Sequence, residues 1–164
     1  MKTIYAVLHG DKEFGPDPEM TPKGKAQIAE LLHLLPQNPS NVIVGTGRRH
    51  HGVCKALGLK MTHSSPIIGD PTSLDVINGE KMLVFADGYR CPLSMDRSIS
   101  DLSLAAMPFI LMLEDNTVLC TGRPFLKALG WEEAQSGSVV LITVGEHEIS
   151  FEVLESLGVT EPTK

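Results

Sequence analysis

The chain has 164 residues, of which 42% are hydrophobic and 21% are charged, and its formal net charge is −6. This length suits one domain, over residues 1–164, that can bury a sizeable core. Because no basic stripe offsets the negative charge, the composition argues against a nucleic-acid partner. No apolar stretch is long enough to predict a membrane span.

The three cysteines, Cys54, Cys91 and Cys120, have no CxxC spacing. The first ten residues carry one lysine and a very short apolar run, which is unlike a secretory signal. An odd number of cysteines without such a signal indicates reduced thiols, so the sequence predicts a cytoplasmic protein.

The first predicted element is a buried strand at residues 3–8 (TIYAVL), which His9-Gly10 follows at once. Its β-branched and aromatic side chains are typical of a strand in a parallel sheet. In open α/β sheets the carboxyl ends of such strands face the ligand crevice. His9 is therefore placed to meet a substrate, and Gly10 would let the backbone come close to it. Alternatively, His9 only ends the strand and bonds a loop.

A polar loop leads from this strand to a helix that is predicted to begin at Thr21-Pro22. Thr21 is a good N-cap and Pro22 suits the first turn. The apolar face continues to Leu35, and Pro36 ends the segment. A glycine early in a helix costs roughly 1 kcal/mol relative to alanine, so we expect Gly24 to serve close packing.

Residues 41–45 (NVIVG) predict a second buried strand, and a helix that ends at Gly58 follows. Two strands that alternate with helices through short joints indicate a parallel sheet. A short strand within residues 59–66 is then predicted to lead to Ile68-Gly69-Asp70. An aspartate beside a glycine and a proline is also what an ordinary turn would contain.

The rest of the chain is predicted to mix strands and helices: a strand at 81–87, a helix at 96–107, a hairpin of 108–114 and 117–120 around Asp115-Asn116, and a helix at 124–129. Residues 138–144 (SVVLITV) are almost wholly apolar, as expected of a central parallel strand. Gly145-Glu146-His147-Glu148 follows, and residues 149–157 predict an amphipathic helix.

Three of these segments resemble motifs of the histidine phosphatase (phosphoglycerate mutase-like) superfamily. His9-Gly10 resembles the Arg-His-Gly at the end of the family's first strand, with Leu8 in the position of the arginine. Residues 20–27 (MTPKGKAQ) resemble Leu-Thr-x-x-Gly-x-x-Gln. Residues 45–54 (GTGRRHHGVC) resemble Ser-Pro-Leu-x-Arg-Ala-x-x-Thr-Ala, with Arg49 in the position of its arginine and Gly45, Val53 and Cys54 in place of its Ser, Thr and second Ala.

The resemblance implies a three-layer α/β/α fold whose mainly parallel sheet includes strands 3–8, 41–45 and 138–144, with a divergent, partly β middle region. It implies that His9 takes a phosphoryl group, and that Arg49, or Arg48 after a small change of register, grips phosphate beside Gly10.

Two further roles follow from the resemblance. Asp70 would donate a proton to the leaving oxygen. The family's second phosphate-binding histidine would correspond to Glu146, or to His147 after a slip of one residue.

Other interpretations of these stretches remain open. Gly45-x-Gly47 after a strand suggests a dinucleotide fingerprint, although His50 stands where its third glycine would be. His50-His51 suggests a metal, but adjacent histidines in a helix point in different directions, so we expect them to be solvated or at the rim of a site. Arg90 and Arg123 lie in predicted loops, either as spare cations for the site or as solvated surface residues.

The sequence supports three functional hypotheses. The first is a domain that binds phosphate or a phosphorylated small molecule with little or no phosphatase activity, because Leu8 and Glu146 would weaken catalysis. The second is a weak or specialised phosphomonoesterase, a hydrolase that acts through phospho-His9. The third is an unrelated α/β binding domain. No metal or organic cofactor is implied, and the sequence does not indicate an oligomeric state.

Overall fold

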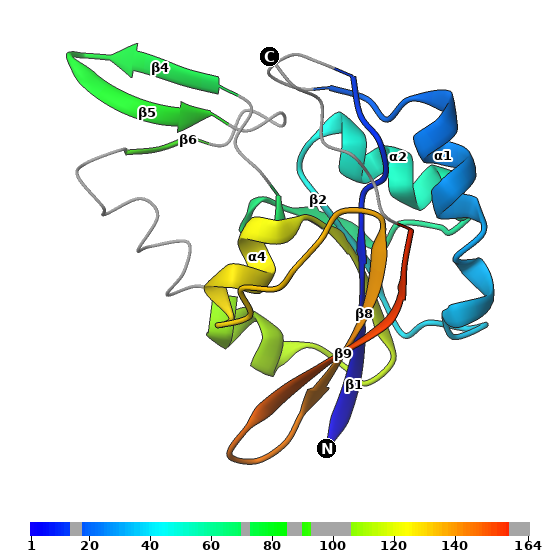
Figure 1. The fold of residues 1–164 in the computed structure, drawn as a ribbon. Helices are drawn as coiled ribbons and strands as arrows, with labels where there is room; N and C mark the ends of the chain where they lie inside the picture. The colour runs from blue at the N-terminus through cyan, green and yellow to red at the C-terminus, as the bar shows by residue number, and fades with distance from the viewer. Residues whose placement is uncertain (14–17, 70–72, 85–89, 93–105, 158–164) are drawn as a thin grey trace.

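A mixed six-stranded sheet with helices on both faces forms the body of the molecule (Figure 1). The computed structural model describes all residues except 14–17, 70–72, 85–89, 93–105 and 158–164. The strands of this sheet are β1 (Lys2–Leu8), β2 (Val42–Gly45), β3 (His63–Ser65), β7 (Thr117–Thr121), β8 (Ser138–Val144) and β9 (Ile149–Ser156). A separate antiparallel sheet consists of β4 (Ser73–Ile77), β5 (Glu80–Val84) and β6 (Arg90–Pro92).

The helices are α1 (Pro22–Ala29), α2 (Arg48–Ala56) and α4 (Arg123–Ala128), together with a helix at residues 106–112. Two short 3₁₀ turns are η1 (Leu32–Leu34) and η2 (Pro66–Ile68). In Figure 1, α1 and α2 cover one face of the sheet, whereas α4 lies on the other. The predicted α/β class and three-layer arrangement are confirmed.

The strand order is β3-β2-β7-β1-β8-β9, and the first four of these strands are mutually parallel. β8 runs antiparallel to β1, and β9 runs antiparallel to β8. The predicted strand at 138–144 is therefore present, but its predicted parallel direction is wrong. β8 lies between two strands and is mostly buried. Such a strand has a nearly continuous apolar sequence whether it runs parallel or antiparallel to its neighbours, so its sequence does not indicate its direction.

Two later predictions are also wrong. Residues 149–157 were expected to form a helix, but they form β9, the strand at the edge of the sheet. Residues 108–114 were expected to pair with 117–120 in a hairpin, but residues 106–112 are helical and β7 lies between β2 and β1. Most of the predicted helix at 96–107 lies outside the described residues.

The core divides into two clusters, one on each face of the sheet. Ile4, Ala6 and Leu8 of β1 pack on one face with α4 and the helix at 106–112. Val7 packs on the other face with side chains of α1 and α2. Leu8 has no exposed surface. The residue in the position of the family's first arginine is thus an ordinary core side chain.

Helix α1 begins as predicted, because the Thr21 hydroxyl accepts a hydrogen bond from the Gly24 backbone N–H at 3.0 Å. It ends at Ala29 and not near Leu35 as predicted, and the 3₁₀ turn η1 follows it. Leu31 and Leu35 are nevertheless buried. A side chain on Gly24 would place Cβ only 2.2 Å from the Asp11 carbonyl oxygen. The predicted close packing at Gly24 is therefore confirmed, and it holds α1 against the chain that leaves β1.

Candidate functional site

The four parallel strands all end at the same edge of the sheet. Leu8 at the end of β1 lies opposite Thr121 of β7, and Gly45 at the end of β2 lies opposite Ser65 of β3. The polar side chains that follow or end these strands are buried: His9, Thr46, Arg49, His50, Ser65 and Thr121. Because buried polar groups are costly unless they have partners, this cluster marks the edge as the candidate site.

His9 is 4% exposed, and its Nδ1 atom lies 3.0 Å from the Gly10 carbonyl oxygen. A carbonyl oxygen only accepts hydrogen bonds, so this contact assigns the proton to Nδ1. In its neutral form such a ring would have its lone pair on Nε2. That is the form of an imidazole that can attack phosphorus.

Gly10 has a packing role that the sequence did not predict. A Cβ atom there would lie 2.7 Å from the Gly24 carbonyl oxygen, so the turn after His9 is pressed against α1. The Gly10 backbone N–H also donates to the Met20 sulfur at 3.2 Å. Gly10 therefore fixes the backbone that carries His9; its phosphate-binding role stays a prediction.

Helix α2 brings Arg49 and His50 to this edge. Arg49 is 4% exposed and His50 is fully buried, with its ring centroid 5.7 Å from that of His9. The expectation that His50 would be solvated or at a rim is wrong, whereas His51 is exposed. His50 is thus a residue of the site that the sequence reasoning missed.

The start of α2 has an unusual electrostatic character. Its N-cap is Gly47, with a φ of 132°, which supplies no side chain to cap the helix, and its first turn contains no acidic residue. Instead the first four residues are Arg48, Arg49, His50 and His51. Cations near the positive end of a helix dipole are unfavourable, and they become favourable when an anion binds there.

Two glycines allow the ends of β2 and η2 to approach each other. A Cβ on Gly45 would lie 2.6 Å from the Ile68 carbonyl oxygen, and one on Gly69 would lie 2.5 Å from the Thr46 hydroxyl. The buried Thr121 hydroxyl donates to the same Ile68 carbonyl at 2.6 Å. The segment that precedes residue 70 is therefore fixed at the site edge, while Asp70 itself lies outside the described residues.

Glu146 and His147 are not at this edge. They lie in the turn between β8 and β9, and Val144 pairs with Lys2 at the opposite end of β1 from His9. Both side chains are more than 90% exposed, and they face each other at 3.9 Å. The predicted placement of these two residues beside His9 is wrong, because β8 runs in the opposite direction to the parallel strands.

Another parallel strand that is followed by a helix does reach this edge, namely β7 followed by α4. β7 is the parallel neighbour of β1, and Thr121-Gly122 joins it to the start of α4 at Arg123. Thr121 therefore ends a parallel strand at the site edge, and the sequence did not predict this residue there. Its signal in the sequence was the run VLCTG before a proline-initiated helix, which we assigned to a hairpin. Arg123 is exposed.

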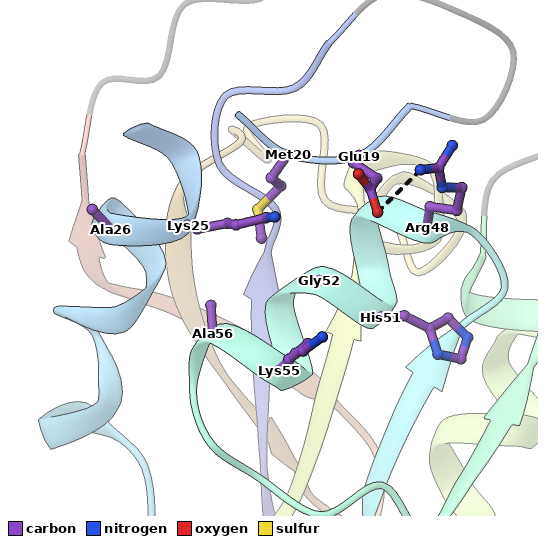
Figure 2. A pocket seen from close by; sticks show the side chains of 9 residues that line it. All are labelled: Glu19, Met20, Lys25, Ala26, Arg48, His51, Gly52, Lys55 and Ala56. Carbon is purple, nitrogen blue, oxygen red and sulfur yellow. Dashed lines mark ion pairs between the residues drawn. The ribbon is translucent and has the colours of Figure 1, made fainter. Parts of the chain in front are cut away.

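Arg48 does not share the buried position of Arg49. Its side chain is 58% exposed, and its guanidinium lies 3.0 Å from the Glu19 carboxylate. Both Arg48 and Glu19 line a hollow of about 580 Å³ between α1 and α2, shown in Figure 2. Met20, whose sulfur accepts the Gly10 N–H, also lines it, so the hollow lies beside the His9 edge and is not the same site.

Two properties of the described residues concern metal and membrane binding. No group of three or more His, Cys, Asp or Glu side chains among them is placed to share a metal ion. None of their helices has the length and apolar character that crossing a membrane requires.

No family model and no curated protein matches the sequence. Its structure, however, is similar to several solved ones. A proposed alpha-ribazole-5′-P phosphatase from Escherichia coli has a TM-score of 0.67 at 13% identity, over 97% of this chain and 100% of that one. Rv3214 from Mycobacterium tuberculosis has a TM-score of 0.60 at 15% identity, over 97% and 98% of the two chains.

TTHB049 from Thermus thermophilus has a TM-score of 0.59 at 17% identity, over 85% of this chain and 92% of that one. These identities are too low to carry residue roles from one chain to the other. The likeness does confirm the architecture that the sequence motifs implied. The chain has a phosphoglycerate mutase-like α/β fold.

Proposed function

We propose that the edge formed by His9, Arg49 and His50 binds inorganic phosphate or the phosphoryl group of a small molecule, with little or no hydrolysis. The observation that carries this proposal is the burial of all three basic side chains beside a helix start that has no capping side chain and no acid. Guanidinium groups and the N–H groups of a helix start are the donors that phosphate oxygens prefer.

Weak hydrolysis is expected because Leu8 stands in the position that the resemblance assigns to an arginine, and because neither Glu146 nor His147, the candidates for the second phosphate-binding residue, lies at this edge. Leu8 is a buried hydrocarbon, and Thr121 offers a hydroxyl that is already bonded to a carbonyl. Removing one well-placed donor of this kind costs on the order of 10²-fold in rate. Glu146, which the sequence predicted to cause part of this loss, lies too far along the sheet to do so.

A second candidate is a weak or specialised phosphomonoesterase, and the proton on His9 Nδ1 favours it. Nε2 would form a bond to phosphorus while the ester P–O bond breaks, and the leaving alkoxide would take a proton from an acid such as Asp70. Water would then cleave the P–N bond and release phosphate. The third hypothesis, an α/β binding domain of unrelated fold, is not supported, given the structural likeness.

Calorimetric titration with inorganic phosphate, alongside an assay with p-nitrophenyl phosphate, tests the proposal. We expect phosphate to bind the unmodified chain and binding to fall at least tenfold in His9→Asn and in Arg49→Gln. Lys60→Gln, which removes an exposed cation away from the site, should bind normally. Folded variants that bind phosphate as well as the unmodified chain would refute the proposal, and His9-dependent hydrolysis would favour the phosphomonoesterase.

A further inference from the structure

The hollow between α1 and α2 has a floor of small and apolar groups. Met20, Ala26, Gly52 and Ala56 line it, and Met20 is 2% exposed (Figure 2). Where two helices usually fill the space between them with larger side chains, these residues leave a volume of about 580 Å³. That volume lies within the range of sites that bind small molecules, about 300–1,000 Å³.

The rim of the hollow is cationic in a chain whose net charge is −6. Lys25 extends into it from α1, and Lys55 borders it from α2 (Figure 2). Glu19 is the one carboxylate among the lining residues, and Arg48 already pairs with it at 3.0 Å. Within the described part of the chain, Lys25 and Lys55 have no ion pair. Two ammonium groups without a counter-charge among these residues thus stand above an apolar floor.

From this arrangement we propose a second binding site, for a small organic anion with a flat or short apolar body. The acidic group would contact Lys25 and Lys55, and the body would lie on Met20 and the two alanines. A thioether is well suited to such a floor, because its polarisable sulfur packs favourably against rings. An ammonium group on a flexible stem can follow an acidic group of any geometry, so carboxylates, sulfonates and phosphates would all be accepted.

This site is distinct from the phosphate-binding edge. Met20 separates the two: its sulfur accepts the Gly10 N–H, and its methyl group faces Gly52, where a Cβ would lie 3.3 Å away. The apolar floor also distinguishes the ligands, because inorganic phosphate has no body to place on it. The proposal therefore stands whether or not the edge at His9 binds phosphate.

The fluorescence of 8-anilinonaphthalene-1-sulfonate, which rises when the dye enters an apolar site, measures this binding. N-phenyl-1-naphthylamine has the same rings without the sulfonate and serves as the uncharged probe. We expect the sulfonate to bind one to one and at least tenfold more tightly than the neutral probe. His9→Asn should bind it normally, which separates this result from the fate of the phosphate site.

Matched variants locate the binding. Lys25→Gln/Lys55→Gln should weaken sulfonate binding at least tenfold, whereas Lys60→Gln/Lys127→Gln, which removes two exposed cations outside the lining, should not. Ala56→Leu keeps the charges but fills the floor, and it should also weaken binding. Equal loss in both lysine pairs, equal affinity for both probes, or unchanged binding in Ala56→Leu would each overturn the proposal.

Discussion

The rings of His9 and His50 meet edge to face, with centroids 5.7 Å apart and planes inclined at 62°. One ring follows the first strand and the other lies in the first turn of α2, so the contact joins the two segments that form the candidate site. Both rings are buried, which gives His50 a role beyond that of a helix surface residue.

Replacing His50 by glutamine should weaken phosphate binding about tenfold. The ring offers a charge-assisted donor to a bound dianion, and such bonds contribute roughly 1.5–3 kcal/mol. Titration calorimetry measures the loss, and His51→Gln, in the same helix turn but exposed, is the matched control. If both variants bind phosphate like the unmodified chain, His50 contributes packing and not affinity.

Replacing Leu8 by arginine, the residue that the resemblance expects, should destabilise the chain without creating a phosphatase. Leu8 has no exposed surface and packs among apolar side chains of the core. A buried charge without a partner costs several kcal/mol, whereas Leu8→Met should cost less than about 1.5 kcal/mol. Urea unfolding measures both. A stable Leu8→Arg variant that hydrolyses p-nitrophenyl phosphate would show that this position still opens to the site.

Replacing Gly24 by alanine should lower the free energy of unfolding by about 1–3 kcal/mol, although alanine favours helices. The new Cβ would lie 2.2 Å from the Asp11 carbonyl oxygen, which is backbone and cannot rotate away. Gly52→Ala is the control, because its Cβ would meet only the flexible end of Met20 at 3.3 Å. Chemical denaturation should show Gly52→Ala as neutral or stabilised; equal losses in both would contradict the argument.

Local signals predicted much of the part of the chain that forms the site. Three features were predicted correctly from residues that are close in sequence or lie on one face of one element. They are the Thr21 cap, the close packing at Gly24 and the strand at residues 41–45. For the same reason His9 was correctly placed directly after the first strand, and Arg49 was correctly placed in the segment that follows the second strand. His50 was missed because its burial depends on where β1 lies in space. The sequence of α2 alone gives no information on the position of β1.

The errors came from information that lies in pairing between distant strands. Ile149, Phe151 and Val153 alternate as a strand requires, but Ile149, Val153 and Leu157 also fit a helix period, and the choice depends on pairing with β8. Likewise, an apolar run such as residues 138–144 is compatible with either direction. Because the strand was predicted to be parallel but is antiparallel, Glu146 and His147 lie at the opposite end of the sheet from the predicted one.

Cys54 and Cys120 provide a test that is independent of the phosphate site. A hydrogen bond from Cys120 lowers the pKa of the Cys54 thiol, although burial opposes this, whereas the same bond and complete burial raise the pKa of Cys120. Cys54 should therefore ionise first and react first with iodoacetamide as the pH rises. Mass spectrometry of a Cys91→Ser variant identifies the modified residue.

Replacing Cys120 by alanine removes the donor that stabilises the Cys54 thiolate and leaves the burial that disfavours it. The pKa of Cys54 should rise, so the midpoint of its alkylation rate against pH should move upward and the rate at neutral pH should fall. Cys120→Ser retains a hydroxyl donor and should shift the midpoint less. An unchanged or lower midpoint in Cys120→Ala would mean that the two sulfur atoms do not share this hydrogen bond.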